Sequence, residues 1–220
     1  MRRDDAAFGP RPVASPVVQP SVARVHVIVA GVEPWDDHEA RQKADILDWL
    51  ASHDDVFRRV KPATPPRHLV SYVVLVDGAR RSMLLVEHRD AGLRLPAGGH
   101  VEPGEDPADT ALREAREELG VAASFLPGME ARPLMVSQTT TVGVSAGHTD
   151  VDLWYVLDGD AGVMVAGDAR EFAGWRWWTF EEVLAADPAA LDPHLQRFTA
   201  KLADRLADDR HRKRPRTLSS

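Results

Sequence analysis

A glycine-rich loop followed by an acidic helix constrains this chain more than any other feature of its sequence. From residue 99 the chain reads Gly-His-Val-Glu-Pro-Gly-Glu, then seven further residues, then Arg-Glu-Ala-Arg-Glu-Glu-Leu-Gly-Val. Asp106 is typical of a helix N-cap, Pro107 suits the first helical position, and Gly120 suits a left-handed C-cap. The sequence therefore predicts a helix between Asp106 and Gly120.

Three carboxylates of this helix project from one side. Glu114, Glu117 and Glu118 stand at positions i, i+3 and i+4, which share a helix face. Like charges at this spacing destabilise an isolated helix by roughly 0.2–0.5 kcal/mol per pair, and a solvated acidic face is the ordinary explanation. The preceding glycines favour a different one, because a loop carbonyl together with carboxylates suits a hard cation such as Mg²⁺.

The segment resembles the Nudix box, GX5EX7REUXEEXGU with U an aliphatic residue, and it matches at every specified position. The fixed places are held by Gly99, Glu105, Arg113, Glu114, Glu117, Glu118 and Gly120, and the aliphatic places by Ala115 and Val121. Ala115 is a small residue for its place. The flanking segments extend the resemblance over about residues 66–186.

The resemblance implies a Nudix fold, an α/β (α+β) architecture in which a mixed β-sheet is sandwiched between helices. It also implies hydrolysis of a nucleoside diphosphate linked to a group X, with Mg²⁺ as cofactor and Mn²⁺ able to replace it. The metal ligands implied by position are the carbonyl of Gly99 and the carboxylates of Glu117 and Glu118. Glu114 is implied as a further ligand or the general base, and Arg113 as the partner of Glu105 that orients the catalytic helix.

The resemblance further implies an acidic ligand or base in a loop late in the domain. The acidic residues available there are Asp150, Asp152, Asp168 and Glu171. We select Glu171 as the metal ligand, because it comes just before a tryptophan-rich strand. A surface carboxylate without a role in the site is the alternative for each of the four.

Aromatic and histidine residues near the expected cleft are candidates for binding the substrate. Trp154 and Tyr155 alternate across a strand, so we expect one to pack in the core and the other to face the cleft, where it can stack on a nucleobase. His148 is a third substrate-binding candidate, and His100 lies near the same cleft. Core packing or solvent exposure is the simpler explanation for each side chain.

The substrate is inferred by elimination. Markers of the NADH diphosphatase, coenzyme A pyrophosphatase, ADP-ribose and dinucleoside polyphosphate subgroups are missing, and Val136 to Gln138 hold neither the expected proline nor the expected tyrosine. This favours a (deoxy)nucleoside triphosphate or a modified nucleotide. The alternatives are a nucleotide sugar, ADP-ribose, or a nucleotide-sensing module that binds without cleaving. An isomerase of the same fold is excluded, because its chemistry depends on cysteine and the chain has none.

The rest of the chain divides by composition. We expect a flexible arm at 1–20, a strand-and-helix extension with a proline-rich linker at 21–65, the Nudix domain with a C-terminal helix at 66–209, and a disordered basic tail at 210–220. Valine and isoleucine predict a strand at 22–30, and apolar spacing predicts a helix at 36–52. Further expected elements are a hairpin around Asp77-Gly78, strands at 151–157 and 172–180, and a short helix at 181–186.

Composition limits the partners of the chain. The net charge of -7 argues against a domain that grips the phosphate backbone of a nucleic acid, although a bound divalent cation lets an acidic site take a phosphate. No segment approaches the roughly 18 apolar residues of a membrane span, and the absence of cysteine suits the cytoplasm. We therefore expect a cytoplasmic protein with a small-molecule nucleotide as partner and no membrane. The helix at 36–52 is available to build a homodimer.

Overall fold

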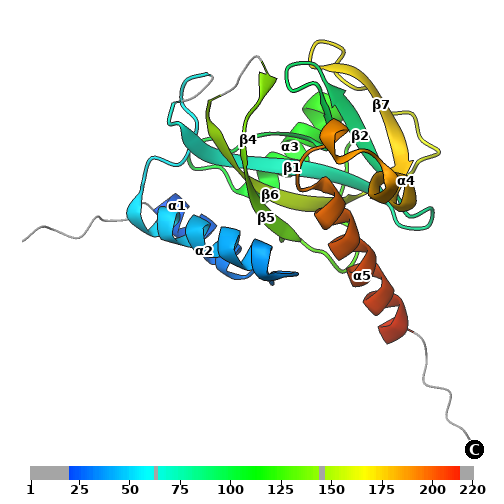
Figure 1. Cartoon of the computed structure of the whole chain (residues 1–220), viewed down its shortest axis with the longest axis horizontal. Helices are drawn as coiled ribbons and strands as arrows, with labels where there is room; N and C mark the ends of the chain where they lie inside the picture. Colours follow the sequence, from blue (N-terminus) through cyan, green and yellow to red (C-terminus); the bar gives the residue numbers. More distant parts are fainter. Residues whose placement is uncertain (1–19, 62–63, 144–146, 214–220) are drawn as a thin grey trace, which may run out of the picture.

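The computed structural model describes residues 20–61, 64–143 and 147–213. Its elements are α1 (Pro20–Ala30), α2 (Asp37–Ser52), β1 (Arg67–Asp77), β2 (Ser82–His88), β3 (Leu93–Leu95), β4 (Ala97–His100), α3 (Pro107–Leu119), β5 (Met135–Thr140), β6 (Thr149–Asp158), β7 (Phe172–Thr179), α4 (Phe180–Ala185), the 3-10 turn η2 (Pro188–Ala190) and α5 (Leu195–Lys213), as labelled in Figure 1. The arm expected at 1–20 lies outside the described residues except for Pro20, as does the end of the tail from residue 214.

One mixed sheet of seven strands organises the molecule. β1 is its central strand, and β6 runs parallel to it from Arg67 to Val76. Two antiparallel strands share the other edge of β1: β4 lies beside its first half and β2 beside its end. β7 pairs with β2, β3 pairs with β2, and β5 pairs with β6. The hairpin expected at Asp77-Gly78 is confirmed, because that turn joins β1 to β2.

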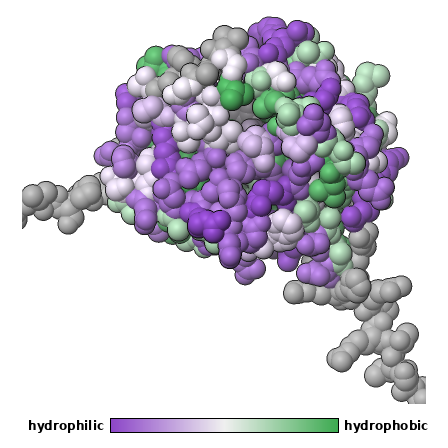
Figure 2. All heavy atoms as spheres, viewed as in Figure 1, coloured by the Kyte–Doolittle hydropathy of each residue, from purple (hydrophilic) through white to green (hydrophobic). Residues whose placement is uncertain are grey.

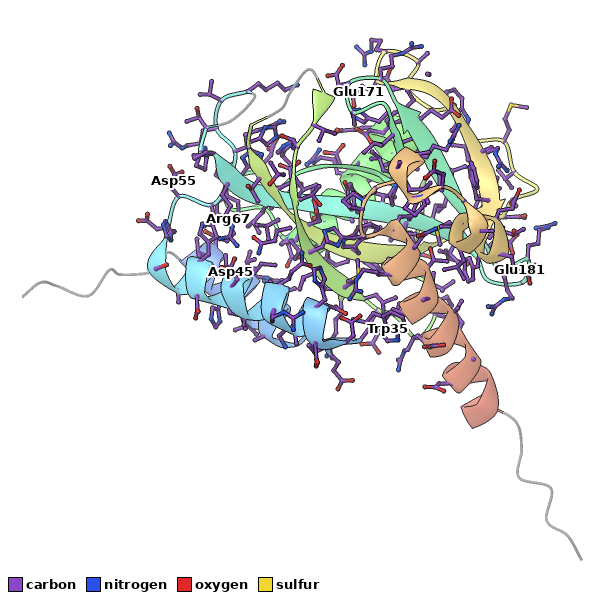
Figure 3. The ribbon with its side chains drawn as sticks, in the orientation of Figure 1. Trp35, Asp45, Asp55, Arg67, Glu171 and Glu181 are labelled. Carbon is purple, nitrogen blue, oxygen red and sulfur yellow. The ribbon has the colours of Figure 1, made fainter. Side chains whose placement is uncertain are left out.

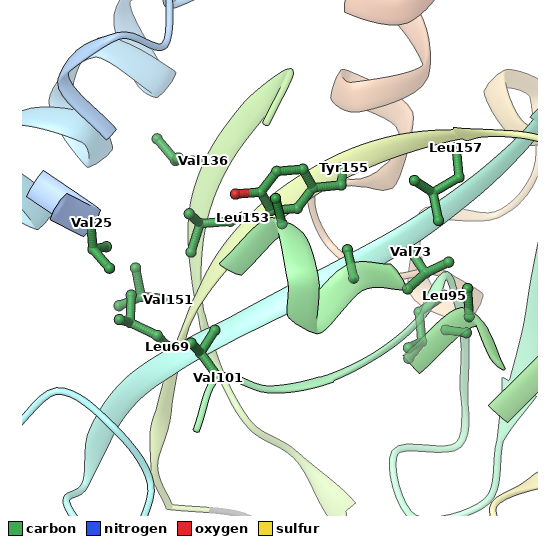
Figure 4. Close-up of a cluster of buried hydrophobic side chains, with 14 of the residues drawn as sticks. Val25, Leu69, Val73, Leu95, Val101, Val136, Val151, Leu153, Tyr155 and Leu157 are labelled. Carbon is green, nitrogen blue, oxygen red and sulfur yellow. The ribbon is translucent and has the colours of Figure 1, made fainter. Parts of the chain in front are cut away.

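Helices cover both faces of this sheet, which confirms the expected mixed sheet between helical layers. On one face α1, α2 and α3 enclose a cluster of apolar side chains that includes Leu69, Leu153 and Leu157 (Figure 4). On the other face α4 and α5 cover a second cluster around Trp154 and Phe198. Neighbouring residues of one strand enter different clusters, because successive side chains point to opposite faces of a sheet.

The N-terminal extension begins with a helix, so the strand predicted at 22–30 is wrong. Val22, Val25 and Val29 are buried at helical spacing, and they belong to the same apolar cluster as Leu69 and Val151 of the sheet. Their β-branched side chains suggested a strand, but conformational propensity is weak, and burial of one helical face against the sheet overrides it. The extension therefore shares its core with the rest of the chain.

Ion pairs connect the start of α2 to helix α5 near the C-terminus of the described chain. Asp36, the N-cap of α2, pairs with Arg197 of α5. One turn further along, Lys201 Nζ lies 2.6 Å from Glu39 Oε1, and both side chains are buried. The helix predicted at 36–52 is confirmed as α2. Helix α5 continues to Lys213, so the first residues of the tail expected to be disordered from 210 are helical.

The surface carries few large apolar groups. Figure 2 shows a face that is mostly hydrophilic, with apolar residues in small scattered groups. Val27, Val163 and Met164 are among the most exposed apolar side chains, and single exposures of this kind are normal in a folded protein. Within the described ranges no helix is both long and apolar enough to cross a membrane.

Candidate active site

A cleft of about 830 Å³ opens beside the segment 99–121, called the box from here on. The box, the N-terminal extension and the loop before β7 all contribute to its walls, through Arg58, Lys61, Gly98, Gly99, Glu114, Glu118 and Glu171. Figure 3 shows Glu171 at the upper edge of the molecule. The volume falls in the range of about 300–1,000 Å³ that is common for small-molecule sites.

Local sequence fixes where the box helix α3 begins and ends. The Asp106 side chain accepts a hydrogen bond from the Ala108 N–H at 2.9 Å, Pro107 occupies the first turn, and Gly120 closes the helix with φ 66°. All three features agree with the sequence prediction. The core face of the helix is made of small or apolar residues: Ala108, Ala111, Ala115 and Leu119. The small Ala115 is fully buried there, so α3 lies close against the sheet.

Arg113 joins three carboxylates of the box. Its Nε and Nη2 donate to the two oxygens of Glu105 at 2.9 and 3.0 Å, so the pair implied by the resemblance is present as a bidentate contact. Its Nη1 donates to Glu114 at 2.6 Å and to Glu117 at 3.1 Å. Burial alone would raise the pKa of Glu105, but the hydrogen bonds from Arg113 bring that pKa below its usual value. Arg113 thus holds the start of the box against its helix.

Glu114 and Glu118 lie against strand β4. Glu118 Oε2 accepts a hydrogen bond from the Gly98 N–H at 3.0 Å. A Cβ on Gly99 would lie 2.0 Å from Glu114 Oε1, so residue 99 leaves room for this carboxylate only as glycine. Burial raises the pKa of both glutamates, and for Glu118 a hydrogen bond shared with Glu171 and the nearby charges raise it further. The carboxyl groups of Glu114, Glu118 and Glu171 are therefore close enough to interact, in a site that is partly shielded from water.

This donor set fits a divalent cation. Burial and the neighbouring charges disfavour the charged forms of Glu114 and Glu118, and a hard cation held beside them would relieve both effects. Gly99 passes directly beside Glu114. Glu117 differs from the others, because its side chain is 60% exposed and contacts Arg113. The structure thus brings four of the five expected metal-site residues together, with Glu117 at the outer edge.

The other acidic residues considered for the late ligand lie elsewhere. Asp168 pairs with Arg170 at 2.5 Å. Asp152 is fully buried, and its Oδ2 accepts hydrogen bonds from Ser137 and Thr139. Of the four candidates, Glu171 is thus the one that joins the carboxylates of the box.

The histidines expected near the cleft are part of its wall. His148 is buried, and its Nε2 lies 3.4 Å from Oδ1 of Asp150. His100 lies next to Gly99 on β4, and burial lowers the pKa of His100 to about 2, an effect to which the nearby Arg58 contributes. His100, His148 and Asp150 line the same cleft as the carboxylates of α3.

Trp154 and Tyr155 are both fully buried, so the expectation that one of them faces the cleft is wrong. Their strand β6 lies inside the sheet with helices over both faces, and both alternate positions are therefore core positions. Trp154 stacks on Phe198 with ring centroids 4.8 Å apart. Tyr72 of β1 lines the cleft instead and is partly exposed, with its hydroxyl donating to Asp192 at 3.1 Å.

Sequence reasoning missed two cations that the N-terminal extension adds to the cleft. Arg58 and Lys61 follow α2 and lie among the lining residues. Burial lowers the pKa of Arg58, while the carboxylates of Asp150 and Glu114 act in the opposite direction. The only sequence signal is the short basic run Arg-Arg-Val-Lys ahead of the prolines. Nothing in that run predicts contact with a box some forty residues downstream.

Comparison with known proteins places the chain in a family whose domain carries this box. The NUDIX domain matches residues 66–202, and the chain belongs to the NUDIX family. The box, strands β1 to β7 and most of the cleft lie inside the matched range, whereas α1, α2 and the cleft residues Arg58 and Lys61 lie outside it.

Among characterised proteins the chain resembles the asymmetrical bis(5'-nucleosyl)-tetraphosphatases of Mus musculus and Rattus norvegicus. Each is 42% identical over 66 residues, which is 29% of this chain and 42% of the relative's own length. The match therefore spans less than half of these relatives. Among solved structures, a Caenorhabditis elegans Ap4A hydrolase binary complex superposes with a TM-score of 0.50 at 18% identity, over 64% of this chain and 98% of that one. That similarity shows a shared fold.

Proposed function

We propose that this protein is a divalent-cation-dependent pyrophosphohydrolase that cleaves a nucleoside diphosphate linked to a group X. The proposal depends on one observation, the convergence of Glu114, Glu118 and Glu171 in a cleft of small-molecule size. Membership of the NUDIX family supports it. When bound there, Mg²⁺, or Mn²⁺ in its place, neutralises phosphate charge and activates water.

The residues of the chain divide the remaining work. Glu118, Glu171 and the Gly99 carbonyl are proposed to hold the cation, with Glu117 at the rim. The contact of Arg113 with Glu105 holds the loop at the start of the box against α3. Burial raises the pKa of Glu114, and a carboxylate with a raised pKa is better matched to taking a proton from water near neutral pH. Glu114 is therefore our choice for the general base.

Arg58, Lys61 and Tyr72 are proposed to hold the substrate. The two cations line the same cleft as the carboxylates and offer positive charge to the phosphates, which an acidic site otherwise repels. The ring of Tyr72 is partly exposed in the cleft and provides an aromatic surface for a nucleobase. It takes the place for which Trp154 or Tyr155 was expected.

The proposed substrate is a (deoxy)nucleoside triphosphate or a modified nucleotide, because the other subgroup markers are missing from the sequence. A bis(5'-nucleosyl) tetraphosphate is the second candidate, supported by the activity named for the mouse and rat relatives. The absence of a tyrosine at Val136 to Gln138 weighs against that second candidate. Nucleotide sugars and ADP-ribose follow behind them. A cytoplasmic location remains part of the proposal, since the chain contains no cysteine.

The test is a panel of hydrolysis assays with Mg²⁺ and with Mn²⁺. It compares nucleoside triphosphates, deoxynucleoside triphosphates, oxidised nucleotides, dinucleoside tetraphosphates, nucleotide sugars and ADP-ribose, with products identified. Glu117→Gln and Glu118→Gln are expected to lose at least about two orders of magnitude in rate, the scale of lost metal-borne charge stabilisation. Glu181→Gln is the matched control, because Glu181 is exposed on α4 (Figure 3).

Two outcomes contradict the proposal. Full activity in Glu118→Gln means that the metal ligands are assigned wrongly. If the wild-type protein binds nucleotides but turns over none of them with either metal, the chain is a nucleotide-sensing module rather than an enzyme.

A further inference from the structure

Four side chains outside the carboxylate group converge on one point at the end of the cleft. His68 of β1, His100 of β4, His148 just before β6 and Asp150 of β6 offer four ligand atoms that all lie within 4.8 Å of one another. The Nε2 atoms of His68, His148 and His100 lie 3.0, 3.4 and 4.0 Å from Asp150 Oδ1. We call these four residues the histidine group.

The register of the sheet places three members of this group. His68 and Asp150 are direct partners across β1 and β6, and His100 is the partner of Val70, two residues along β1 on its other edge. The fourth is held close by, because the Thr141 N–H donates to the His148 carbonyl at 2.9 Å. The group therefore depends on backbone ladders of three neighbouring strands, which are rigid supports for a site.

Hydrogen bonds outside the group determine which imidazole nitrogen faces its centre. Nδ1 of His68 lies 2.7 Å from the Pro65 carbonyl, which can only accept, so Nδ1 carries the proton and Nε2 keeps a lone pair in the neutral ring. The Thr141 hydroxyl donates to the His148 carbonyl and lies 3.1 Å from Nδ1 of the same residue, where it can accept. Histidines that bind metals are oriented by outer partners of this kind.

Three of the atoms at the centre of the group, from His68, His100 and Asp150, lack hydrogen bonds within the described residues. Within the described part of the chain, Nε2 of His68, Nε2 of His100 and Oδ1 of Asp150 are buried and have no hydrogen-bond partner. Buried polar atoms are paired in the great majority of cases. In the neutral ring the Nε2 lone pair of His68 faces Asp150 Oδ1 at 3.0 Å, and a cation between them, a proton or a metal ion, turns that repulsion into attraction.

We propose that His68, His100, His148 and Asp150 bind a zinc ion through three imidazole nitrogens and one carboxylate oxygen. Zn²⁺ takes four such ligands in a tetrahedron at about 2.0–2.2 Å, which separates the ligand atoms by about 3.3–3.6 Å. The separations of 3.0–4.0 Å from Asp150 Oδ1 require only small adjustments. A nitrogen-rich donor set selects Zn²⁺ over Mg²⁺.

Four protein ligands leave no open position for a reacting water, so the zinc site is structural. It ties the end of β4 to β1 and β6 at the residue directly after Gly99. Successive residues of a strand face opposite sides, so His100 turns away from the face on which Gly99 meets Glu114. The inference does not depend on the hydrolase proposal, because zinc binding is measurable without nucleotide.

The experiment titrates the full chain with zinc alone. Protein stripped with EDTA and freed of the chelator is titrated with ZnCl₂ against a chromophoric competitor, and bound metal is counted by mass spectrometry. We expect one tightly bound Zn²⁺ per chain. His148→Ala is expected to weaken zinc binding at least about 100-fold, more than the loss of an outer hydrogen-bond partner costs. His53→Ala removes an exposed histidine just after α2 and leaves the affinity unchanged, and so does Glu118→Gln.

A second variant and a second signal guard against misfolding. His100→Gln alters the partly exposed member of the group, and circular dichroism of each variant checks that it folds. Co²⁺ in the wild-type site is expected to show the visible bands of four-coordinate cobalt, which both variants lose. The proposal is overturned if the wild type binds no tight zinc, if folded His148→Ala and His100→Gln bind it as well as the wild type, or if Glu118→Gln abolishes it.

Discussion

The two faces of strand β4 present two groups of ionisable side chains that differ in chemistry and in origin. On the α3 side, Gly99 meets Glu114, and every ligand offered there is an oxygen. On the other side, His100 belongs to the histidine group, in which most ligands are nitrogens. Glu114 and Glu118 project from helix α3, and Glu171 comes from the loop before β7. The histidine group comes from β1, β4 and β6, with His148 just before β6. The α3 face therefore suits an exchangeable hard cation that takes part in a reaction, and the opposite face suits a permanently bound structural ion.

The two groups of side chains are held in place by different interactions. The carboxylates repel one another and depend on Arg113 for compensation. The histidine group depends on strand register and on hydrogen bonds that its imidazole Nδ1 atoms make to the Pro65 carbonyl and the Thr141 hydroxyl. Changes on the helix side are therefore expected to alter catalysis, and changes on the sheet side are expected to alter metal retention and stability.

Adding a methyl group at either of two neighbouring glycines gives the largest expected effect. Gly99→Ala places a Cβ 2.0 Å from Glu114 Oε1, the movable end of a side chain, and is expected to lower kcat by about 100-fold through misplacement of that carboxylate. Gly98→Ala places a Cβ 2.5 Å from the Ser71 carbonyl, so the backbone must move and the free energy of unfolding falls by about 1–3 kcal/mol. Steady-state kinetics and urea denaturation separate the two. Equal stability losses in both variants would contradict the distinction between the faces.

Removal of zinc is expected to act on stability alone. At free Zn²⁺ near 100 times its dissociation constant, binding stabilises the native state by about 2.7 kcal/mol, which corresponds to a Tm higher by about 5–10 °C for a chain of this size. Thermal melts with and without EDTA measure the difference, and His148→Ala is expected to show none. A Tm that EDTA lowers equally in wild type and His148→Ala would place the effect outside the histidine group.

Arg113→Lys tests the support of the carboxylates with the charge preserved. Lysine cannot reproduce the bidentate contact that Arg113 makes with Glu105, so kcat is expected to fall about 10-fold while zinc affinity stays unchanged. Arg116→Lys serves as control, because the Arg116 side chain donates to the Leu112 carbonyl of its own helix. An unaltered rate in Arg113→Lys would show that charge alone is enough.

Arg58→Gln is expected to give the smallest effect, a rise in KM of about 3- to 10-fold with little change in kcat, as for the loss of one charge contact to phosphate from a half-buried side chain. Arg59→Gln is the matched control, since Arg59 is exposed and pairs with Asp55. A fall in kcat without a rise in KM would move Arg58 from substrate binding to support of the carboxylates.

Local signals made one of these regions predictable. Asp106, Pro107 and Gly120 determine the bounds of α3 by their own backbone chemistry, and the glutamate spacing determines its acidic side. Glu171 was reached only through the family resemblance, because its position beside Glu118 depends on a loop far along the chain.

The histidine group, the burial of the aromatic residues and the helical state of α1 depend on tertiary structure. His68 and Asp150 become neighbours only through the parallel pairing of β1 with β6, which no short pattern encodes. Trp154 and Tyr155 were misjudged for the same reason, since alternation predicts opposite faces but not that both faces are covered. In α1 a β-branched composition gave way to the burial of Val22, Val25 and Val29 on one helical side.

The buried pair of Lys201 and Glu39 has a consequence for any shortened form of the protein. A chain that starts at residue 66, where the NUDIX match begins, would lose both partners of the Lys201 ammonium, the Glu39 carboxylate and the Glu33 carbonyl, and with them the burial of this ion pair. Loss of the α1 valines would also leave Leu69 and Val151 exposed to water. We therefore expect the smallest autonomous folding unit to be longer than the family domain and to include the helices that precede it.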